Sequence, residues 1–228
     1  MKPWRQGGVL FLLLMATGCG SSNERSSSAN QGATAGWRIQ YSPSMPPDPT
    51  LGGPGTWYFD FPSDPNYPAC IPSQNCNSVG YVTNSYSGPV THSVSMTFQI
   101  VTTGAPSFNY VMESDNTCTT PASVRLFLEG KNDDFTGEFY RWWANPVGYE
   151  LQPISGNVTL TVALTPDQWS SVYGKVGNYD ATTLAGFHDV LTNLGRAGMT
   201  FGGGCFFGHG VNVSDGTARF VLINYTIS

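Results

Sequence analysis

The stretch HSVSMTFQIV, residues 92–101, alternates apolar and polar side chains without a break. Its apolar positions share one face of an extended chain and its polar positions share the other, with Val94, Met96, Phe98 and Ile100 opposed to Ser95, Thr97 and Gln99. Successive side chains of a β-strand point to opposite faces of a sheet. The stretch therefore predicts a strand with one face buried.

The same period of two recurs further along the chain. It predicts inward positions at Val124, Leu126 and Leu128, and again at Val158, Leu160, Val162 and Leu164. Residues 217–227 are apolar on both faces in part, which is typical of a strand in the middle of a sheet. Two further strands are expected at 37–41 and 56–61, on either side of a loop at 42–55 that holds eight Pro or Gly residues in fourteen.

Composition supports an all-β class. The 228 residues include 27 Gly and 16 Pro, with 13% aromatic and only 11% charged residues, whereas a disordered chain would have few aromatics and many charges. Two short helices are expected in connections: one begins at Thr165-Pro166-Asp167-Gln168 and ends at Gly174, and the other covers about 181–194. We therefore predict one jelly-roll β-sandwich domain over residues 37–228.

The N-terminal segment predicts export. Lys2 and Arg5 precede an apolar run at 9–15 that is too short for a stable membrane span. The following Ala16-Thr17-Gly18-Cys19 resembles the lipobox of bacterial lipoproteins. That resemblance implies a signal peptide at 1–18, lipidation of Cys19 and, because Gly20 is not Asp, sorting to the outer membrane of a host with two membranes. The alternative is ordinary signal cleavage with Cys19 incidental.

Residues 19–36 predict a flexible tether, because this Ser-, Gly- and Asn-rich stretch has no apolar anchor. The formal net charge of −5 leaves no basic patch for nucleic acid, so a nucleic-acid partner is not expected. The expected partners are a carbohydrate, the membrane through the N-terminal lipid, and another envelope protein as an alternative.

Four cysteines remain after Cys19: Cys70, Cys76, Cys118 and Cys205. In an oxidising compartment they predict disulfides, and four cysteines permit three pairings. The short loop between Cys70 and Cys76 favours a local bond, which would leave Cys118 to Cys205. Metal binding is the weaker alternative because no Cys-x-x-Cys pair occurs.

The C-terminal half, through VRLFLEG (124–130), EFYRWWANP (138–146), LTPDQWSSVYGK (164–175), MTFGGGCFFGHGVNV (199–213) and ARFVLINYTI (218–227), resembles the galactose-binding-like jelly rolls. Many carbohydrate-binding modules and discoidin-type domains share that fold. The resemblance rests on the order and spacing of segments and covers about half of the chain. It implies sugar binding, although a fold does not fix a function.

Residues 140–145 combine the side chains that sugar recognition uses. Trp142 or Trp143 could stack on a pyranoside, with Arg141 and Asn145 as partners of its hydroxyl groups. The alternative places both tryptophans in the core beneath a helix and pairs Arg141 with an acidic neighbour. His209, in a Gly-rich loop at 202–210, is a further candidate ligand contact, with a tight turn as its structural alternative.

Catalysis and cofactors have less support. A glycoside hydrolase would need two carboxylates across a cleft, and no pair among Glu113, Asp115, Glu129, Glu138 and Glu150 is marked by its spacing. No cofactor is expected; residues 132–134 offer too few oxygen ligands to predict a calcium site. The sequence favours a non-catalytic, carbohydrate-binding envelope lipoprotein, with a structural or protein-interaction lipoprotein as the alternative and a carbohydrate-active enzyme as a third possibility.

Overall fold

The computed structural model describes residues 36–42, 50–53, 56–63, 77–110, 120–133, 136–203 and 207–228. The described chain is dominated by antiparallel strands. These are β1 (Trp37–Ser42), β2 (Thr50–Gly53), β3 (Thr56–Asp60), β4 (Ser78–Ser85), β5 (Ser93–Tyr110), β6 (Ser123–Gly130), β7 (Arg141–Ala144), β8 (Tyr149–Glu150), β9 (Val158–Ala163), β10 (Trp169–Ser170), β11 (Leu194–Gly202) and β12 (Val211–Ile227). The all-β, jelly-roll-like sandwich predicted from the sequence is confirmed.

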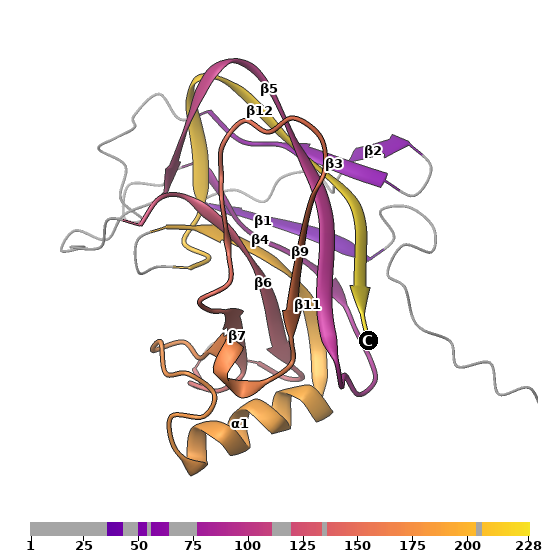
Figure 1. Ribbon diagram of the computed structural model, residues 1–228, viewed down its shortest axis with the longest axis vertical. Coiled ribbons are helices and arrows are strands. Elements are labelled where there is room, and N and C mark those ends of the chain that lie inside the picture. The colour runs from indigo at the N-terminus through magenta and orange to yellow at the C-terminus, as the bar shows by residue number, and fades with distance from the viewer. Residues whose placement is uncertain are drawn as a thin grey trace, which may run out of the picture.

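The strands form a curled sheet with two connected halves (Figure 1). One half runs β10-β7-β6-β11-β4-β1, with β8 also paired to β6, and the other runs β9-β5-β12-β3-β2. The start of β12 joins them, because Val211 pairs with Val79 of β4 while the later part of β12 lies between β5 and β3. The central position predicted for the last strand is therefore confirmed.

Strand β5 shows why alternation is a dependable signal. Side chains at 93–100 alternate between half-buried and buried, as the sequence predicts. The strand continues to Tyr110, beyond the expected end at 101. Gly104, with φ of +77°, lies opposite Gly216, and the register of β12 shifts beside this pair. The Gly-Ala-Pro run at 104–106 therefore accommodates a bulge inside a long strand pair and does not end it.

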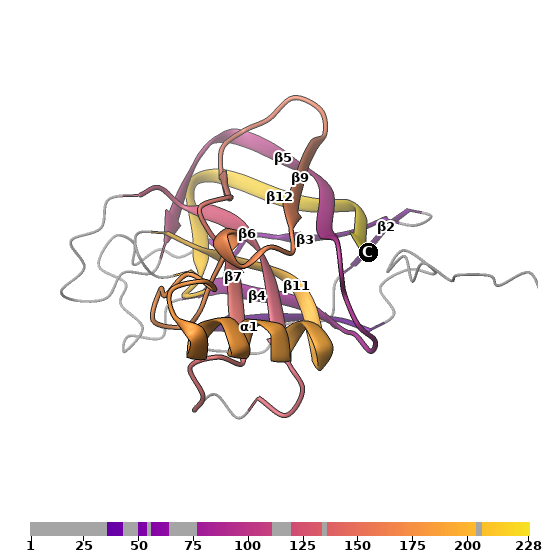
Figure 2. The same cartoon turned by 60° about the horizontal axis from the view of Figure 1, so that its bottom comes forward.

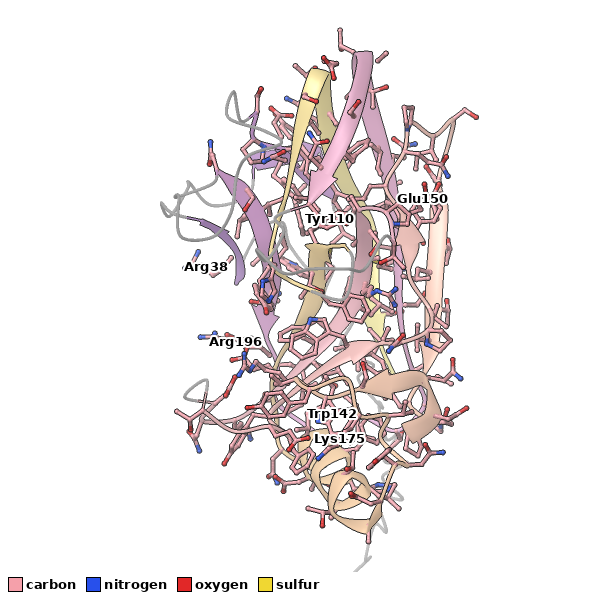
Figure 3. The ribbon with its side chains drawn as sticks, turned by 90° about the vertical axis from the view of Figure 1, so that its left-hand side faces the viewer. Arg38, Tyr110, Trp142, Glu150, Lys175 and Arg196 are labelled. Carbon is pink, nitrogen blue, oxygen red and sulfur yellow. The ribbon has the colours of Figure 1, made fainter. Side chains whose placement is uncertain are left out.

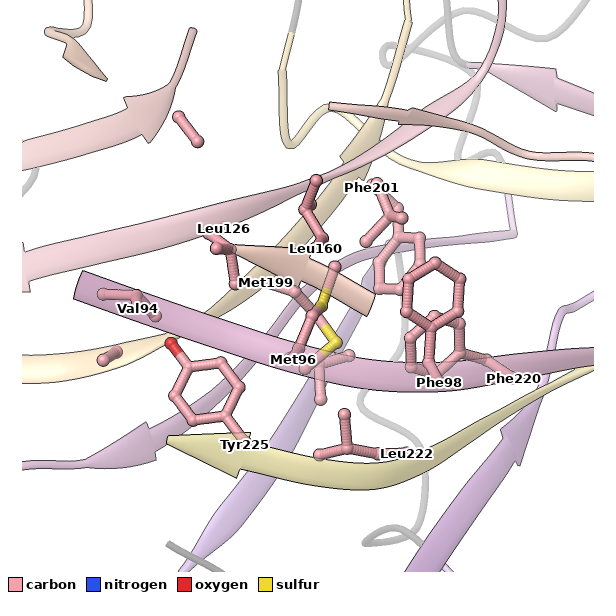
Figure 4. Packing of buried hydrophobic residues seen from close by; sticks show 14 of the residues in the cluster. Val94, Met96, Phe98, Leu126, Leu160, Met199, Phe201, Phe220, Leu222 and Tyr225 are labelled. Carbon is pink, nitrogen blue, oxygen red and sulfur yellow. The ribbon is translucent and has the colours of Figure 1, made fainter. Parts of the chain in front are cut away.

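Aromatic side chains fill the space between the two halves. Phe98 and Phe220 stack with ring centroids 4.9 Å apart, and Phe201 of β11 meets Phe220 edge-on at 5.3 Å (Figure 4). Near the other end, the ring of Trp37 in β1 lies 5.2 Å from that of Tyr225 in β12. The Tyr225 hydroxyl donates to the Gly198 carbonyl at 3.2 Å, so this buried polar group is satisfied. Ring packing and apolar burial thus hold the two halves together.

One of the two expected helices is an α-helix. Helix α1 (Ala181–Thr192) begins after Asp180, whose carboxylate accepts from the Thr183 backbone N–H at 2.7 Å. Figure 2 shows α1 across one end of the strands, and the helix buries its own Phe187 side chain. The first expected helix is wrong: only the 3₁₀ turn η2 (Pro166–Gln168) forms there. The chain extends at Trp169, which joins β10 and donates from its indole to the Ala163 carbonyl at 2.8 Å.

Several predictions fall on residues that the structure does not describe. Cys19, the signal peptide at 1–18 and the tether up to residue 35 lie outside the described residues. So do the four cysteines predicted to form disulfides, Cys70, Cys76, Cys118 and Cys205. Within the described part of the chain, no helix has the length and apolar character needed to cross a bilayer.

Candidate functional site

A cavity of about 130 Å³ is lined by residues of β7, β10 and the loop at 207–209, together with one side chain of β4. The residues that line it are Tyr81, Arg141, Trp143, Ser170, Ser171, Val172, Gly174, Phe207 and His209. Three of the five residues predicted from the sequence to contact a ligand, Arg141, Trp143 and His209, meet here. The volume is small beside the roughly 300–1,000 Å³ of pockets for drug-sized ligands, so it suits one compact group.

Arg141 begins β7 and is held by an acidic neighbour. Its Nε lies 3.0 Å from Oδ2 of Asp133, whose side chain is fully buried, while the Arg141 side chain is 12% exposed. The acidic neighbour that the structural alternative expects for Arg141 is therefore present, and the Asp133 carboxylate, in the turn at 132–134, is engaged by a guanidinium. The contact with Asp133 holds the guanidinium in place at the cavity wall. Removing either partner would leave a buried charge uncompensated.

Trp142 is a core residue, so its predicted role as a stacking platform is wrong. Its side chain is fully buried, and its ring lies 5.0 Å from that of Phe187 on α1. The indole Nε1 donates to the Phe139 carbonyl at 2.8 Å, which satisfies its one polar group. Figure 3 shows Trp142 between the strands and α1. The physical reason is the covering helix, which closes this sheet face.

Trp143 lines the cavity but cannot serve as a stacking platform either. It is 5% exposed, because its ring packs against Phe127 of β6 with centroids 5.3 Å apart. Its Nε1 is buried and has no hydrogen-bond partner in the described structure. Unlike Trp142, Trp143 therefore has a buried indole N–H without an acceptor, in a side chain that lines the cavity.

Asn145 stands behind the cavity and does not line it. Its Nδ2 donates to Oγ of Ser170 at 3.2 Å, and its backbone N–H donates to the Gln168 carbonyl at 2.8 Å. Because Ser170 does line the cavity, Asn145 positions a wall residue through this side-chain hydrogen bond. The direct sugar contact predicted for Asn145 is replaced by this supporting position.

Two lining residues that the sequence did not single out carry polar atoms of interest. Ser171 is 2% exposed, and its Oγ is buried without a hydrogen-bond partner among the described residues. Tyr81 projects from β4, and burial, the largest influence, raises the pKa of its phenol to about 12. Tyr81 is thus a neutral phenol at physiological pH. Ser171 lies in the stretch expected to be helical. Because the chain forms strand β10 just before Ser171 instead, the sequence did not predict that Ser171 lines the cavity.

The loop that carries His209 approaches β4 closely because of a glycine. Gly208 has φ of +84°, and a Cβ at this position would lie 2.6 Å from the Tyr81 hydroxyl. Only glycine tolerates both the left-handed backbone and the contact. His209 itself is exposed at the cavity.

Arg125 of β6 does not line the cavity but contacts the lining residue Phe207. Its Nη1 donates to the carbonyls of Ala144 and Pro146 at 2.9 and 3.2 Å, and its guanidinium lies 4.0 Å from the ring centroid of Phe207. Burial lowers the pKa of Arg125 to about 10. This cation therefore ties the turn after β7 to the loop that carries His209.

Two of the glutamates considered for catalysis, Glu129 and Glu138, are engaged in ion pairs. Glu129 Oε1 lies 3.4 Å from Nη1 of Arg196, and Glu138 Oε1 lies 3.0 Å from Nζ of Lys175. Burial raises the pKa of Glu129 despite the pairing. Among the described residues, no group of three or more His, Cys, Asp or Glu side chains is placed to hold a metal ion.

Comparison with known proteins gives no match: no family model, no curated protein and no solved structure is significantly similar to this chain.

Proposed function

We propose that this chain is an exported, lipid-anchored protein of the bacterial cell envelope whose β-sandwich domain binds carbohydrate without transforming it. The binding site is the cavity between Arg141, Trp143 and His209. The observation that carries the proposal is their convergence: residues selected from the sequence for sugar contact, from separate segments of the chain, line one cavity.

The cavity and its surroundings offer the two kinds of surface that sugars need. Polar groups of Tyr81, Arg141 and Ser171 line it and can orient hydroxyl groups. Tyr173 lies between the lining residues Val172 and Gly174 and is 74% exposed. An exposed phenol ring can pack against the C–H face of a pyranoside. We therefore expect Tyr173, and neither Trp142 nor Trp143, to stack on the sugar ring.

The test is calorimetric titration of the full chain, in detergent micelles, with a panel of neutral and acidic mono- and oligosaccharides. Tyr173→Ala should weaken binding by about two- to tenfold, which corresponds to one aromatic contact. Tyr179→Ala is the matched control, because Tyr179 is 69% exposed and neither of its chain neighbours lines the cavity.

A panel in which no sugar binds to the folded protein contradicts the proposal. That result would favour the alternative hypothesis, a structural or protein-interaction lipoprotein without a sugar site. It has one observation in its favour, since both tryptophans that suggested a sugar platform are buried.

The proposed anchor rests on Cys19 and is tested separately. Cys19→Ala should abolish fatty-acid incorporation and release the protein from the membrane fraction. In a host with two membranes, Gly20→Asp should retain the lipidated protein in the inner membrane. Persistent lipidation of the Cys19→Ala variant would overturn this part of the proposal without affecting the sugar site.

A further inference from the structure

Several of the polar side chains that line the cavity can donate hydrogen bonds. Trp143 Nε1 can only donate a hydrogen bond, Arg141 is a cation, and the hydroxyl groups of Tyr81 and Ser171 can donate. No Asp or Glu side chain lines the cavity among the residues that the structure describes. A ligand that fits this wall brings acceptors.

We propose that the cavity receives the carboxylate of an acidic sugar, a single uronic acid residue, in preference to a neutral sugar. This inference rests on the proposed function and names the class of sugar that the site takes. Its starting point is the pair of buried atoms, Trp143 Nε1 and Ser171 Oγ, that have no partner in the described structure.

Buried polar groups in folded proteins are nearly always hydrogen-bonded, and one left without a partner is destabilising. Trp143 is 5% exposed and Ser171 is 2% exposed, yet both line the same cavity. Neither atom is exposed to water in the described structure, so the proposal requires small side-chain shifts on binding that let ligand oxygens accept from them. The carboxylate of a uronic acid has two oxygens with several lone pairs, whereas a neutral sugar presents hydroxyl groups that must also donate.

The charged side chain nearest the ligand is Arg141, which lines the cavity, whereas the carboxylates of Asp133 and Glu129, which also act on Tyr81, lie outside the lining. Tyr81 remains a neutral donor, since its pKa is about 12. The anion would therefore meet donors and a cation before it meets Asp133.

The ligand should carry an isolated charge. The cavity holds about 130 Å³, which accommodates one end of a sugar ring. The chain has a formal net charge of −5, so its long-range field repels a polyanion. A uronic acid at a chain end or next to neutral sugars satisfies both conditions, and a continuous polyuronate does not.

The test compares three ligands that differ at one group: galacturonic acid, its methyl ester, and galactose. Isothermal titration of the full chain in detergent micelles should show the acid binding at least about tenfold more tightly than the ester, which keeps the ring and hydroxyl groups and loses the charge. Glucuronic acid with its own ester repeats the comparison in another stereochemistry.

The outcomes distinguish failure of the acidic-sugar inference from failure of carbohydrate binding. Equal binding of acid, ester and galactose overturns the acidic-sugar inference and leaves carbohydrate binding in place. No binding of any sugar overturns both. Binding of an acetylated dipeptide through its terminal carboxylate, without binding of any sugar, shows a peptide site and also overturns both.

Matched variants locate the carboxylate. Ser171→Ala and Trp143→Phe each remove one donor and should weaken galacturonate binding by about tenfold. Ser78→Ala and Trp57→Phe are the controls, because Ser78 Oγ and Trp57 Nε1 are also buried without partners but neither residue lines the cavity. Equal losses in test and control variants would overturn the placement of the ligand. Ser171→Ala keeps the test valid if Trp143→Phe does not fold.

Discussion

Polar side chains on the outer face of β5 and β9 differ in their hydrogen bonding from those beside the cavity at β7. On the outer face, Ser95 and Thr161 share a hydrogen bond of 2.7 Å, and Thr97 and Thr159 share one of 2.9 Å. These hydroxyl groups reach water and still have protein partners. In the cavity, the buried Trp143 Nε1 has none.

The contrast separates polar groups that the fold satisfies from polar groups that it leaves without a partner. An array of exposed hydroxyl groups that pair across strands stabilises a sheet and needs no ligand. A buried donor without a partner is a rare and unfavourable feature that a ligand can relieve. The adjacent tryptophans show the same difference within one strand, because Trp142 Nε1 donates to the Phe139 carbonyl and Trp143 Nε1 has no such acceptor.

The largest expected effect separates the two tryptophans by their role in the core. Trp142→Ala should lower the free energy of unfolding by about 3–5 kcal/mol, because it removes a fully buried ring that contacts Phe187. Urea unfolding followed by circular dichroism measures the loss. Tyr179→Ala, at a side chain 69% exposed, should change stability by less than about 0.5 kcal/mol. Similar losses in the two variants would contradict the burial of Trp142.

The next effect concerns pH and the cavity wall. Burial raises the pKa of Tyr81 from 10.0 to about 12, so the folded protein keeps this proton when the unfolded chain has lost it. The contribution of the protonated Tyr81 to the free energy of unfolding is complete below about pH 10. It is lost as the pH rises from about 10 to about 12, which lowers the free energy of unfolding by about 2–3 kcal/mol.

The measurement is the difference in unfolding free energy between the native chain and Tyr81→Phe across this pH range. Phenylalanine cannot ionise, so the variant lacks the contribution of Tyr81. The ionisation of the other tyrosines affects both proteins equally and cancels in the difference. The native chain should lose stability relative to the variant as the pH rises. A constant difference would show that the Tyr81 phenol is not buried as described.

The smallest effects compare one hydroxyl from each region. Thr161→Val removes a bonded hydroxyl from the outer face and should lower stability by less than about 1 kcal/mol. Ser171→Ala removes an orphaned hydroxyl from the cavity, so stability should stay level or rise slightly. Thermal unfolding of the two variants side by side gives the sign. A clear loss for Ser171→Ala would show that its Oγ has a partner in the protein.

Sequence periodicity predicted the fold because the strands that carry it are half-buried. Alternation is visible at 93–100, where buried and half-buried side chains take turns. It failed at 166–173, where Pro166 and a capping-box pattern suggested a helix. The local preference is satisfied by the turn η2, and the pairing of Trp169 with Ala144 then extends the chain. Tertiary pairing outweighed local propensity there.

The candidate site was predictable in part. Arg141 and Trp143 stood out because aromatic and guanidinium groups are adjacent, and His209 stood out because of its glycines. That these residues, with Tyr81 and Ser171, line one cavity depends on how side chains from β4, β7 and β10 lie together in the folded sheet, and no local pattern encodes that. Which tryptophan keeps an unpaired indole depends on the carbonyl of Phe139, and this too is a property of the folded chain.

The most direct measurement is an NMR titration of the ¹⁵N-labelled full chain with galacturonic acid, followed at the indole N–H signals. The variants Trp143→Phe and Trp57→Phe assign the two signals of interest. The signal of Trp143 should shift on saturation, because its Nε1 gains an acceptor, and the signal of Trp57, also without a partner but away from the cavity, should stay in place. A Trp143 signal that does not move while the sugar binds would contradict the assignment of the cavity as the binding site.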